Sequence, residues 1–389
     1  MTPAGSGPKL GVALATLLAA LATAFVWLVL RAETQSAVVG LTVAAAVAGL
    51  LAARFPAAAR LLAGTPERLV QALALSGVAA LALLLREDDF SLLLLTRVMI
   101  AIIACLGLNL QFGYAGVVNF AGASFFGVGG YTAAVLARTT ALPHLLVLLC
   151  GGLAAALAGA LLVVPVLRTK GHYAALVTIA FALLLRTFLE VNDTLGGPQG
   201  LKLRELVVGP FHFNQALALG GWEGSSFLRY LALALVLVTL FFTLVRRLER
   251  SWLGVALDAI RLDEVAAATF GLSIARWKIT AFTLGNFVIG VAGALSAFLI
   301  GFIAPNGYAF SESLVLVSII LLGGIGNPWG LSLAAFVVLL LPEKLQVIQE
   351  HRFLLYAALV ILILVFRPGG LLPRPLRRLG HSAPEKVAP

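Results

Sequence analysis

The side chains that could perform covalent or redox chemistry are few and widely separated in this sequence. Cys105 and Cys150 lie inside apolar runs without metal-ligand spacing, and the chain has no GxxxxGK[ST], HExxH or GxSxG motif. The five histidines stand at the ends of apolar runs, in loops or in the tail: His144, His172, His212, His351 and His381. We therefore expect no enzyme activity, no metal site and no cofactor bound by this chain.

A second set of residues places isolated polar groups inside or at the ends of apolar runs. Polar groups are costly at membrane depth unless they hydrogen-bond or face water, so these residues are candidates for a translocation pathway. The candidates are Asn109, Gln111, Tyr114, Asn119, Ser124, Tyr131, Thr178 and Asn286. For each of them the alternative is a hydrogen bond between helices or an anchor at the end of a span. Glu190 can pair with Arg186 along one helix face, and no acid pair lies deep in a run, which disfavours ion coupling.

The elements that carry these residues are membrane helices, because the composition excludes an ordinary soluble domain. Of 389 residues, 61% are hydrophobic and 11% charged, and the mean hydropathy is +1.04. The net charge of +10 comes from cations in short links between apolar runs, as the positive-inside bias requires, so it does not indicate nucleic-acid binding. The sequence predicts an all-α, polytopic bundle of transmembrane helices.

Apolar runs and basic links predict about 11–12 spans with both termini on the cytoplasmic side. Runs 314–322 and 329–341 are short against the roughly 20 residues of a crossing, so they could cross or re-enter. Residues 1–90 read as extra amino-terminal helices and 91–371 as a core, followed by a basic cytoplasmic tail, 372–389. The expected spans are 10–30, 37–53, 69–85, 92–110, 116–137, 143–167, 173–190, 228–245, 278–303, 314–322, 329–341 and 353–366.

Two apolar segments of the core are interrupted by glycine, GYAGVVNFAGASFFGVGGY at 113–131 and LGGIGNPWGLSLAA at 322–335. Interrupted spans in two halves are typical of inverted-repeat transporters, in which unwound backbone offers dipoles to a substrate. The alternative is that the glycines only allow helices to approach closely.

One long polar segment, 246–278, stands between two apolar runs. Leu253, Leu257, Ile260 and Ala268 recur at helical spacing within it, which predicts a short amphipathic cytoplasmic helix over 251–272. Ser251 could cap its start, and Gly271 is well placed to end it. Such a helix suits the groove of a partner protein, and the alternative is a helix lying on the lipid surface.

The motifs in their order resemble the LivM-type permease subunit of branched-chain amino acid ABC importers. The resemblance covers about 92–371 and depends on GYAGVVNFAGASFFGVGGYTAAVL, KGHYAALVTIAF, GGPQGL, WLGVALDAIRLDEVAAATFGLSIARWK, LLGGIGNPWG and FRPGGLL. It implies a LivHM-type ABC permease fold, with a coupling helix that docks on an ATPase subunit. The residues that it assigns to coupling are Gly254, Asp258, Arg261, Asp263, Glu264, Ala267 and Gly271.

The resemblance also implies partners and a place in the cell. These are a LivH-like sister permease, two LivG/LivF-like ATPase subunits that bind ATP and magnesium, an external substrate-binding protein and the lipid of a bacterial inner membrane. Val117, Asn119 and Gly122 stand where Gln, Ser and His are usual in LivM-like chains, which bears on the substrate. The expected function is import of branched-chain or related hydrophobic amino acids. The alternatives are a urea or short-chain amide permease, or a stand-alone channel or carrier.

Overall fold

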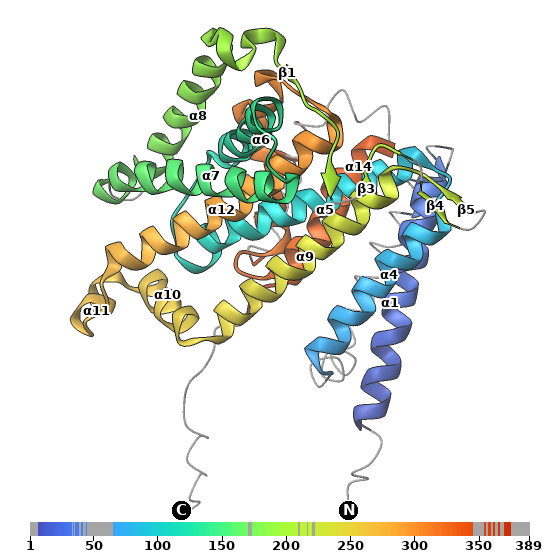
Figure 1. Ribbon diagram of the computed structural model, residues 1–389. Helices are drawn as coiled ribbons and strands as arrows, with labels where there is room; N and C mark the ends of the chain where they lie inside the picture. The colour runs from blue at the N-terminus through green and yellow to red at the C-terminus, as the bar shows by residue number, and fades with distance from the viewer. Residues whose placement is uncertain are drawn as a thin grey trace, which may run out of the picture.

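The computed structural model describes residues 7–32, 65–169, 173–208, 211–215, 217–219, 222–344 and 369–374, with a few positions inside 34–44 and 354–365. These residues are almost entirely helical, as the composition predicts (Figure 1). The α-helices are α1 (Gly7–Arg31), α4 (Glu67–Leu84), α5 (Asp89–Asn109), α6 (Gly122–Thr139), α7 (His144–Arg168), α8 (Tyr173–Val191), α9 (Phe227–Arg250), α10 (Trp252–Leu262), α11 (Glu264–Thr269), α12 (Ile274–Ile300), α13 (Phe310–Gly323) and α14 (Pro328–Lys344).

Short elements connect or extend these helices. Three antiparallel pairs of two or three residues join β1 with β6, β2 with β3, and β4 with β5. The short helices are the π-helix η1 (Leu110–Tyr114) and the 3₁₀-helices η2 (Asp193–Leu195), η3 (Gly197–Gln199) and η4 (Pro305–Tyr308). The strands are β1 (Leu201–Lys202), β2 (Val207–Val208), β3 (Phe211–His212), β4 (Leu217–Leu219), β5 (Trp222–Gly224) and β6 (Phe302–Ile303).

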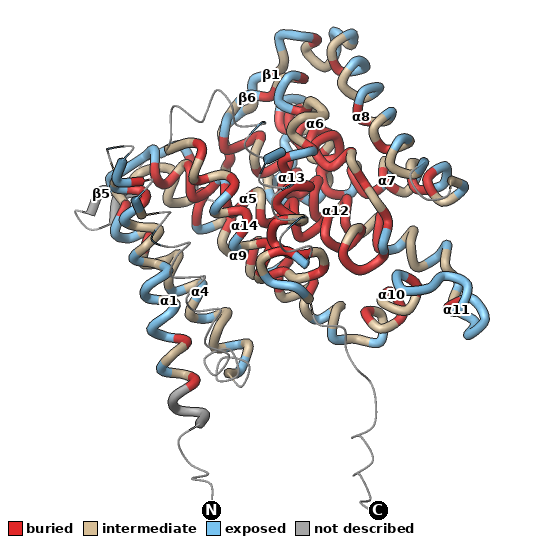
Figure 2. Tube along the Cα trace, turned by 180° about the vertical axis from the view of Figure 1, so that it is seen from behind, coloured by how far each residue is buried: buried red, intermediate tan, exposed pale blue. Residues whose placement is uncertain are grey.

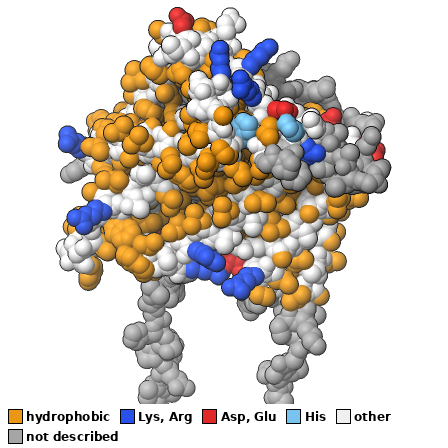
Figure 3. All heavy atoms as spheres, in the orientation of Figure 1, with side chains coloured by type: hydrophobic (Ala, Val, Ile, Leu, Met, Phe, Trp, Pro, Cys, Tyr) orange, Lys and Arg blue, Asp and Glu red, His pale blue; other side chains and the backbone are white. Residues whose placement is uncertain are grey.

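Eight helical segments of the described chain are long and apolar enough to cross a membrane. Two further predicted spans appear as α6, which has 18 residues, and α14, which has 17. The predicted spans 37–53 and 353–366 lie largely outside the described residues. Hydrophobic side chains cover the broad middle of the face in Figure 3, with basic side chains gathered toward its margins, as a membrane-embedded surface requires.

The core forms around α12, which packs against α5, α6 and α7 (Figure 2). Glycines allow these helices to approach closely, because a Cβ at Gly129 of α6 would overlap the carbonyl oxygen of Gly290 of α12. A Cβ at Gly107 of α5 would likewise overlap the carbonyl oxygen of Gly285. Small residues at such contacts are typical of packed membrane helices.

The span predicted over 116–137 starts later than expected, because its helix α6 begins only at Gly122. The chain leaves α5 through the single π-turn η1, and residues 116–121 are not helical. Gly116 adopts φ +65°, a left-handed conformation that interrupts a helix without steric cost to glycine. Apolar composition predicted the membrane location here but not the break in the backbone.

The polar segment 246–278 also differs from the prediction, because two helices, α10 and α11, stand where one helix was expected over 251–272. Asp263 has φ −155° and separates α10 from α11, and its carboxylate accepts hydrogen bonds from the amides of Val265 and Ala266. Ser251 precedes α10, but its hydroxyl donates to the carbonyl of Leu248 and does not cap α10. Gly271, with φ +80°, follows the end of α11, as predicted.

Candidate functional site

Residues 110–121, which we call break 1, are held by a network of three buried amide side chains. Gln111 Nε2 donates to Asn286 Oδ1 on α12 at 2.9 Å and to the carbonyl of Phe282 at 3.2 Å. Its Oε1 accepts from Asn119 Nδ2 at 2.6 Å. All three amides are fully buried, so each depends on these partners to offset the loss of water. Asn119 is thereby pulled into the protein interior, away from the membrane.

Side chains outside α6 accept hydrogen bonds from backbone amides at the end of break 1 and at the start of α6. Thr178 Oγ1 of α8 accepts from the amide of Phe120 at 3.1 Å, and Ser313 Oγ of α13 accepts from the amide of Ala123 at 3.0 Å. The amide of Ala121 donates to Asn119 Oδ1 at 2.8 Å. The first amides of a helix have no partner within it, so these contacts stabilise the helix start inside the protein.

The second interrupted segment, residues 323–327 at the end of α13 and in the turn before α14, which we call break 2, contacts the first. Asn109 Oδ1 accepts from the amide of Gly326 at 2.9 Å. A Cβ at Gly113 would lie 2.7 Å from the Cα of Gly326, so glycine is needed for the two breaks to meet. Two segments some 200 residues apart, singled out by their glycines, therefore lie in direct contact.

The three remaining pathway candidates have different surroundings. Tyr114 is buried in η1 beneath the guanidinium of Arg374, whose Cζ lies 4.4 Å from the ring centroid. Ser124 and Tyr131 are buried on α6, and their hydroxyls have no hydrogen-bond partner among the described residues. The ring of Tyr131 meets that of Tyr308 edge-on, with centroids 6.0 Å apart.

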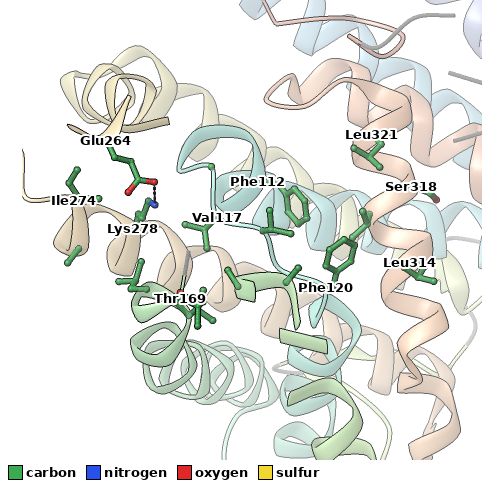
Figure 4. Close-up of a pocket in the computed structure, with 18 of the residues that line it drawn as sticks. Phe112, Val117, Phe120, Thr169, Glu264, Ile274, Lys278, Leu314, Ser318 and Leu321 are labelled. Atoms are coloured by element: carbon green, nitrogen blue, oxygen red, sulfur yellow. Dashed lines mark hydrogen bonds and ion pairs between the residues drawn. The ribbon is translucent and has the colours of Figure 1, made fainter. Parts of the chain in front are cut away.

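A cavity of about 1210 Å³ opens beside break 1 (Figure 4). Its wall is formed by residues of break 1, the end of α7, the start of α8, the start of α12 and one face of α13. Phe112, Val117, Phe120, Leu314 and Leu321 make much of this wall apolar, and Ser318 adds a hydroxyl-bearing side chain. A wall of this kind accommodates an aliphatic group, with few groups that would hold an ion.

None of the eight pathway candidates lines this cavity; their sequence neighbours do. Phe112 follows Gln111, and Val118 and Phe120 flank Asn119. The polar side chains thus hold break 1 from the protein side, whereas the apolar ones face the cavity. As substrate contacts, the eight candidates stay a prediction. Sequence reasoning missed the lining residues, although their position beside glycines in an interrupted apolar segment is a usable signal.

One ion pair stands at the wall of the cavity nearest α11. Glu264 Oε1 accepts from Lys278 Nζ at 2.5 Å, and both residues line the cavity (Figure 4). Glu264 is the first residue of α11, whereas Lys278 belongs to α12. The ion pair thus links one of the predicted coupling residues to the cavity.

The remaining predicted coupling residues form two groups. Gly254, Asp258 and Arg261 lie on α10, toward the membrane helices. Arg261 Nη1 donates to the carbonyl of Gly113 in break 1 at 2.5 Å, and Asp258 accepts from Arg374 at 2.7 and 2.9 Å. Burial and the nearby charge of Arg374 lower the pKa of Arg261, although a guanidinium stays protonated at physiological pH.

The second group, Asp263, Ala267 and Gly271, shapes α11. Asp263 caps the helix, Ala267 is buried, and Gly271 ends the turn that follows. The opposite face of α11 is exposed and apolar, with Val265 76% and the neighbouring Phe270 87% accessible. Figure 1 shows α10 and α11 projecting from one end of the bundle, between α9 and α12. An apolar surface on such a projection is suited to contact with another protein.

The comparisons with known proteins agree with this architecture. A family model described as "Branched-chain amino acid transport system / permease component" matches residues 90–366. The high-affinity branched-chain amino acid transport system permease protein LivM of Escherichia coli (strain K12) is 36% identical over 306 residues, or 74% of this chain and 72% of the relative. The corresponding LivH protein of Salmonella typhimurium is 25% identical over 294 residues, or 69% of this chain and 90% of the relative.

No solved structure matches the chain. The family model nevertheless spans well over half of it, from the start of α5 onward. The chain is a multi-pass membrane protein and belongs to the family of permease components of branched-chain amino acid transport systems.

Proposed function

We propose that this chain is a LivM-type permease subunit of an ATP-binding cassette importer that moves branched-chain amino acids into the cytoplasm. It works beside a LivH-like sister permease, with two LivG/LivF-like ATPase subunits and an external substrate-binding protein. ATP and magnesium bind to the ATPase subunits. The chain itself lies in a bacterial inner membrane with both termini and the 246–278 segment on the cytoplasmic side. The family match and the name of the E. coli relative support this assignment.

The observation that carries the proposal is the dual contact of the 246–278 segment. On one side α11 exposes Val265 and Phe270 to a partner, and on the other side Arg261 of α10 hydrogen-bonds to break 1. A movement imposed on α11 by a closing ATPase dimer is thereby passed to the backbone beside the cavity. This arrangement favours a permease driven by a separate motor over a stand-alone channel, in which the projection has no mechanical role.

The cavity supports an aliphatic cargo. Its wall is formed mainly by leucine, valine, alanine and phenylalanine side chains, and Gln111 and Asn119, which hydrogen-bond to each other in break 1, do not line it. A urea permease needs several free hydrogen-bonding groups along its path, because urea has no apolar part to bury. The apolar wall therefore favours branched-chain amino acids over urea.

The test starts with purification of the tagged chain from its native membrane in mild detergent and identification of co-purifying proteins by mass spectrometry. We expect a second permease and subunits with nucleotide-binding motifs. The recovered assembly is then placed in liposomes with the binding protein, and uptake of radiolabelled leucine is measured with and without ATP. Uptake by the chain alone without ATP would replace the importer with a channel or carrier. ATP-driven uptake inhibited by urea or acetamide, and not by isoleucine or valine, would reassign the substrate.

Two variants test the coupling role of α11 within this assembly. Glu264→Lys places a second cation against Lys278, whereas Gly271→Pro removes the left-handed residue after α11, since proline cannot adopt positive φ. Both proteins should insert normally and lose most leucine uptake while ATP hydrolysis continues. If both variants take up as much leucine per ATP hydrolysed as the wild type, α11 has no role in coupling.

A further inference from the structure

The carboxyl-terminal segment 369–374, which we call the strap, is attached to break 2 by its backbone. The amide of Leu371 donates to the carbonyl of Leu322 at 2.8 Å, and the amide of Leu372 donates to the carbonyl of Gly323 at 3.1 Å. Asn327 Nδ2 donates in return to the carbonyl of Leu372 at 2.9 Å. These three bonds attach the strap to the turn between α13 and α14.

Close glycine packing reinforces this attachment. A Cβ at Gly370 would lie 2.5 Å from the Cα of Gly324 and 2.6 Å from its nitrogen. Gly370 and Gly324 have φ values of +76° and +108°, so both adopt backbone conformations that favour glycine. The strap and break 2 therefore behave as one packed unit.

Arg374, the last described residue, extends from this unit to the 246–278 segment. Its Nη1 and Nη2 donate to the two carboxylate oxygens of Asp258 on α10 at 2.7 and 2.9 Å. Its Nε donates to Glu249, at the end of α9, at 3.1 Å. The side chain is only 7% exposed, and its guanidinium stacks over the ring of Tyr114 in break 1. A planar fork that satisfies one carboxylate with two parallel bonds fixes the relative orientation of its partners.

The protonation of Arg374 is secured by the same partners. Burial by itself disfavours the charged form, but the hydrogen bonds and charge of Asp258, with the charge of Glu249, outweigh it and raise the pKa of Arg374. Arg374 therefore keeps its positive charge at physiological pH.

Arg374 and Arg261 converge on break 2 from different parts of the chain. A Cβ at Gly326 would lie 2.9 Å from Cδ of Arg374 and 3.5 Å from Nη1 of Arg261. Arg261 joins α10 to break 1, and Arg374 joins α10 to break 2 through the strap. The two breaks, which also contact each other through Gly113 and Gly326, are thus both connected to α10.

We propose that Arg374 is a positioning residue for transport, a latch through which the carboxyl-terminal strap transmits movement of α10 to break 2. The proposal rests on the proposed importer function, because a latch has a role only if a motor moves α10. It assigns to part of the basic tail a task distinct from docking on an ATPase subunit.

A purely structural role for Arg374 would have a different signature. An ion pair that is largely buried adds little net stability compared with apolar packing, because desolvation offsets its attraction. If the role of Arg374 were purely structural, its substitution would lower leucine uptake and ATP hydrolysis together, in proportion to the loss of assembled protein. If Arg374 is a latch, its substitution lowers the ratio of leucine taken up to ATP hydrolysed, while the amount of assembled protein stays unchanged.

The experiment measures this ratio in the complete assembly, reconstituted in liposomes with radiolabelled leucine as the probe. We expect Arg374→Gln to lower leucine uptake per ATP about tenfold, in the range of ordinary coupling between sites. Asp258→Asn should do the same, and the double variant should be no worse than the poorer single variant, because both changes open one connection. Arg374→Lys keeps the charge but not the bidentate geometry and should retain part of the coupling.

The matched control is Arg68→Gln, which removes a positive charge from an exposed position at the start of α4, outside the 246–278 segment and the cavity wall. It should keep the wild-type ratio, and an equal loss there would show that net charge rather than the latch matters.

A wild-type ratio in Arg374→Gln, or additive losses in the double variant, would overturn the latch while leaving the importer in place. Failure of the wild-type assembly to couple ATP to uptake would overturn both. If Arg374→Gln does not assemble, the Asp258→Asn and Arg374→Lys ratios decide the matter.

Discussion

The amino-terminal pair α1 and α4 and the central pair α5 and α12 are similarly suited by length and composition to cross a membrane, yet they have opposite surroundings. Only 11% of the apolar stretch of α1 and 6% of that of α4 are buried, against 83% for α5 and 72% for α12. Figure 2 shows the same contrast, with α1 and α4 at the margin and the buried core around α5 and α12. Hydropathy therefore reports which segments lie in lipid, and other features decide which ones the protein encloses.

The features that distinguish the pairs are glycine and buried amides. Gly107, Gly129 and Gly290 permit backbone contact in the core, and Gln111 and Asn286 form hydrogen bonds there. In the amino-terminal pair the corresponding contact is made by Gly77, which faces the side chain of Thr23. Apolar side chains gain little by leaving lipid for another apolar surface, so close packing and hydrogen bonds decide which helices associate.

The amino-terminal pair contacts the core through a few buried apolar residues, among them Leu30, Leu81 and Leu85, and through polar contacts at its ends. Glu67, at the start of α4, forms ion pairs with Arg246 and Arg250 of α9. At the other end, Lys344 donates to the carbonyl of Leu30 and the amide of Ser225 donates to the carbonyl of Arg86. The contrast between an enclosed core and a pair with few buried residues leads to three experiments.

The largest effect is expected from Gly129→Leu. The new side chain would overlap the backbone of Gly290, so α6 and α12 would have to separate, at a cost of about 3 kcal/mol in the free energy of unfolding. The measurement is the yield of monodisperse protein in detergent together with its thermal midpoint. Gly40→Leu is the control, because no atom of the described residues lies within 4 Å of a Cβ at that position. Equal losses of yield and thermal midpoint in both variants would mean that close helix packing is not what distinguishes the core from the amino-terminal pair.

A smaller effect is expected from Gln111→Leu. The change leaves Asn119 Nδ2 and Asn286 Oδ1 without their partner inside the core, which should lower the free energy of unfolding by about 2 kcal/mol. Break 1 should also lose the hydrogen bonds that hold its backbone in place, so leucine uptake should fall by a larger factor than the amount of folded protein. Gln71→Leu on α4 makes the same chemical change in the amino-terminal pair and should stay within about 0.5 kcal/mol of wild type. A more stable Gln111→Leu protein would contradict the role given to the network.

The smallest effect is expected from Glu67→Gln. Loss of the carboxylate charge weakens the ion pairs with Arg246 and Arg250, and we expect about 1 kcal/mol, because the carboxylate is mostly but not fully buried. The readout is the thermal midpoint alongside leucine uptake, which should change less than twofold. Glu87→Gln is the exposed control, with no measurable change expected. Abolished uptake in Glu67→Gln would make the amino-terminal pair part of the working core.

The sequence alone predicted the class of protein and several local features correctly. Apolar runs predicted the helices, glycine predicted the interrupted segments, and the spacing of Arg186 and Glu190 predicted their ion pair, which has an N–O distance of 2.8 Å. The ordered motifs predicted the family. These features depend on residues close together in the chain, or on composition, and can be recognised without knowing which helices meet.

The tertiary structure decided where the polar residues point and which segments touch. Asn119 and Gln111 are polar residues in an apolar segment and were therefore predicted to line the pathway. In the structure they hydrogen-bond to each other, and Phe112, Val117 and Phe120 line the cavity instead. Arg374 belonged to a tail expected to be merely basic, and its partner Asp258 lies 116 positions earlier. A hydrogen bond depends on positions in space that local patterns do not specify. The sequence by itself therefore determined a helical permease with two interrupted spans, and only the packing of those helices determined how breaks, cavity and coupling segment are connected.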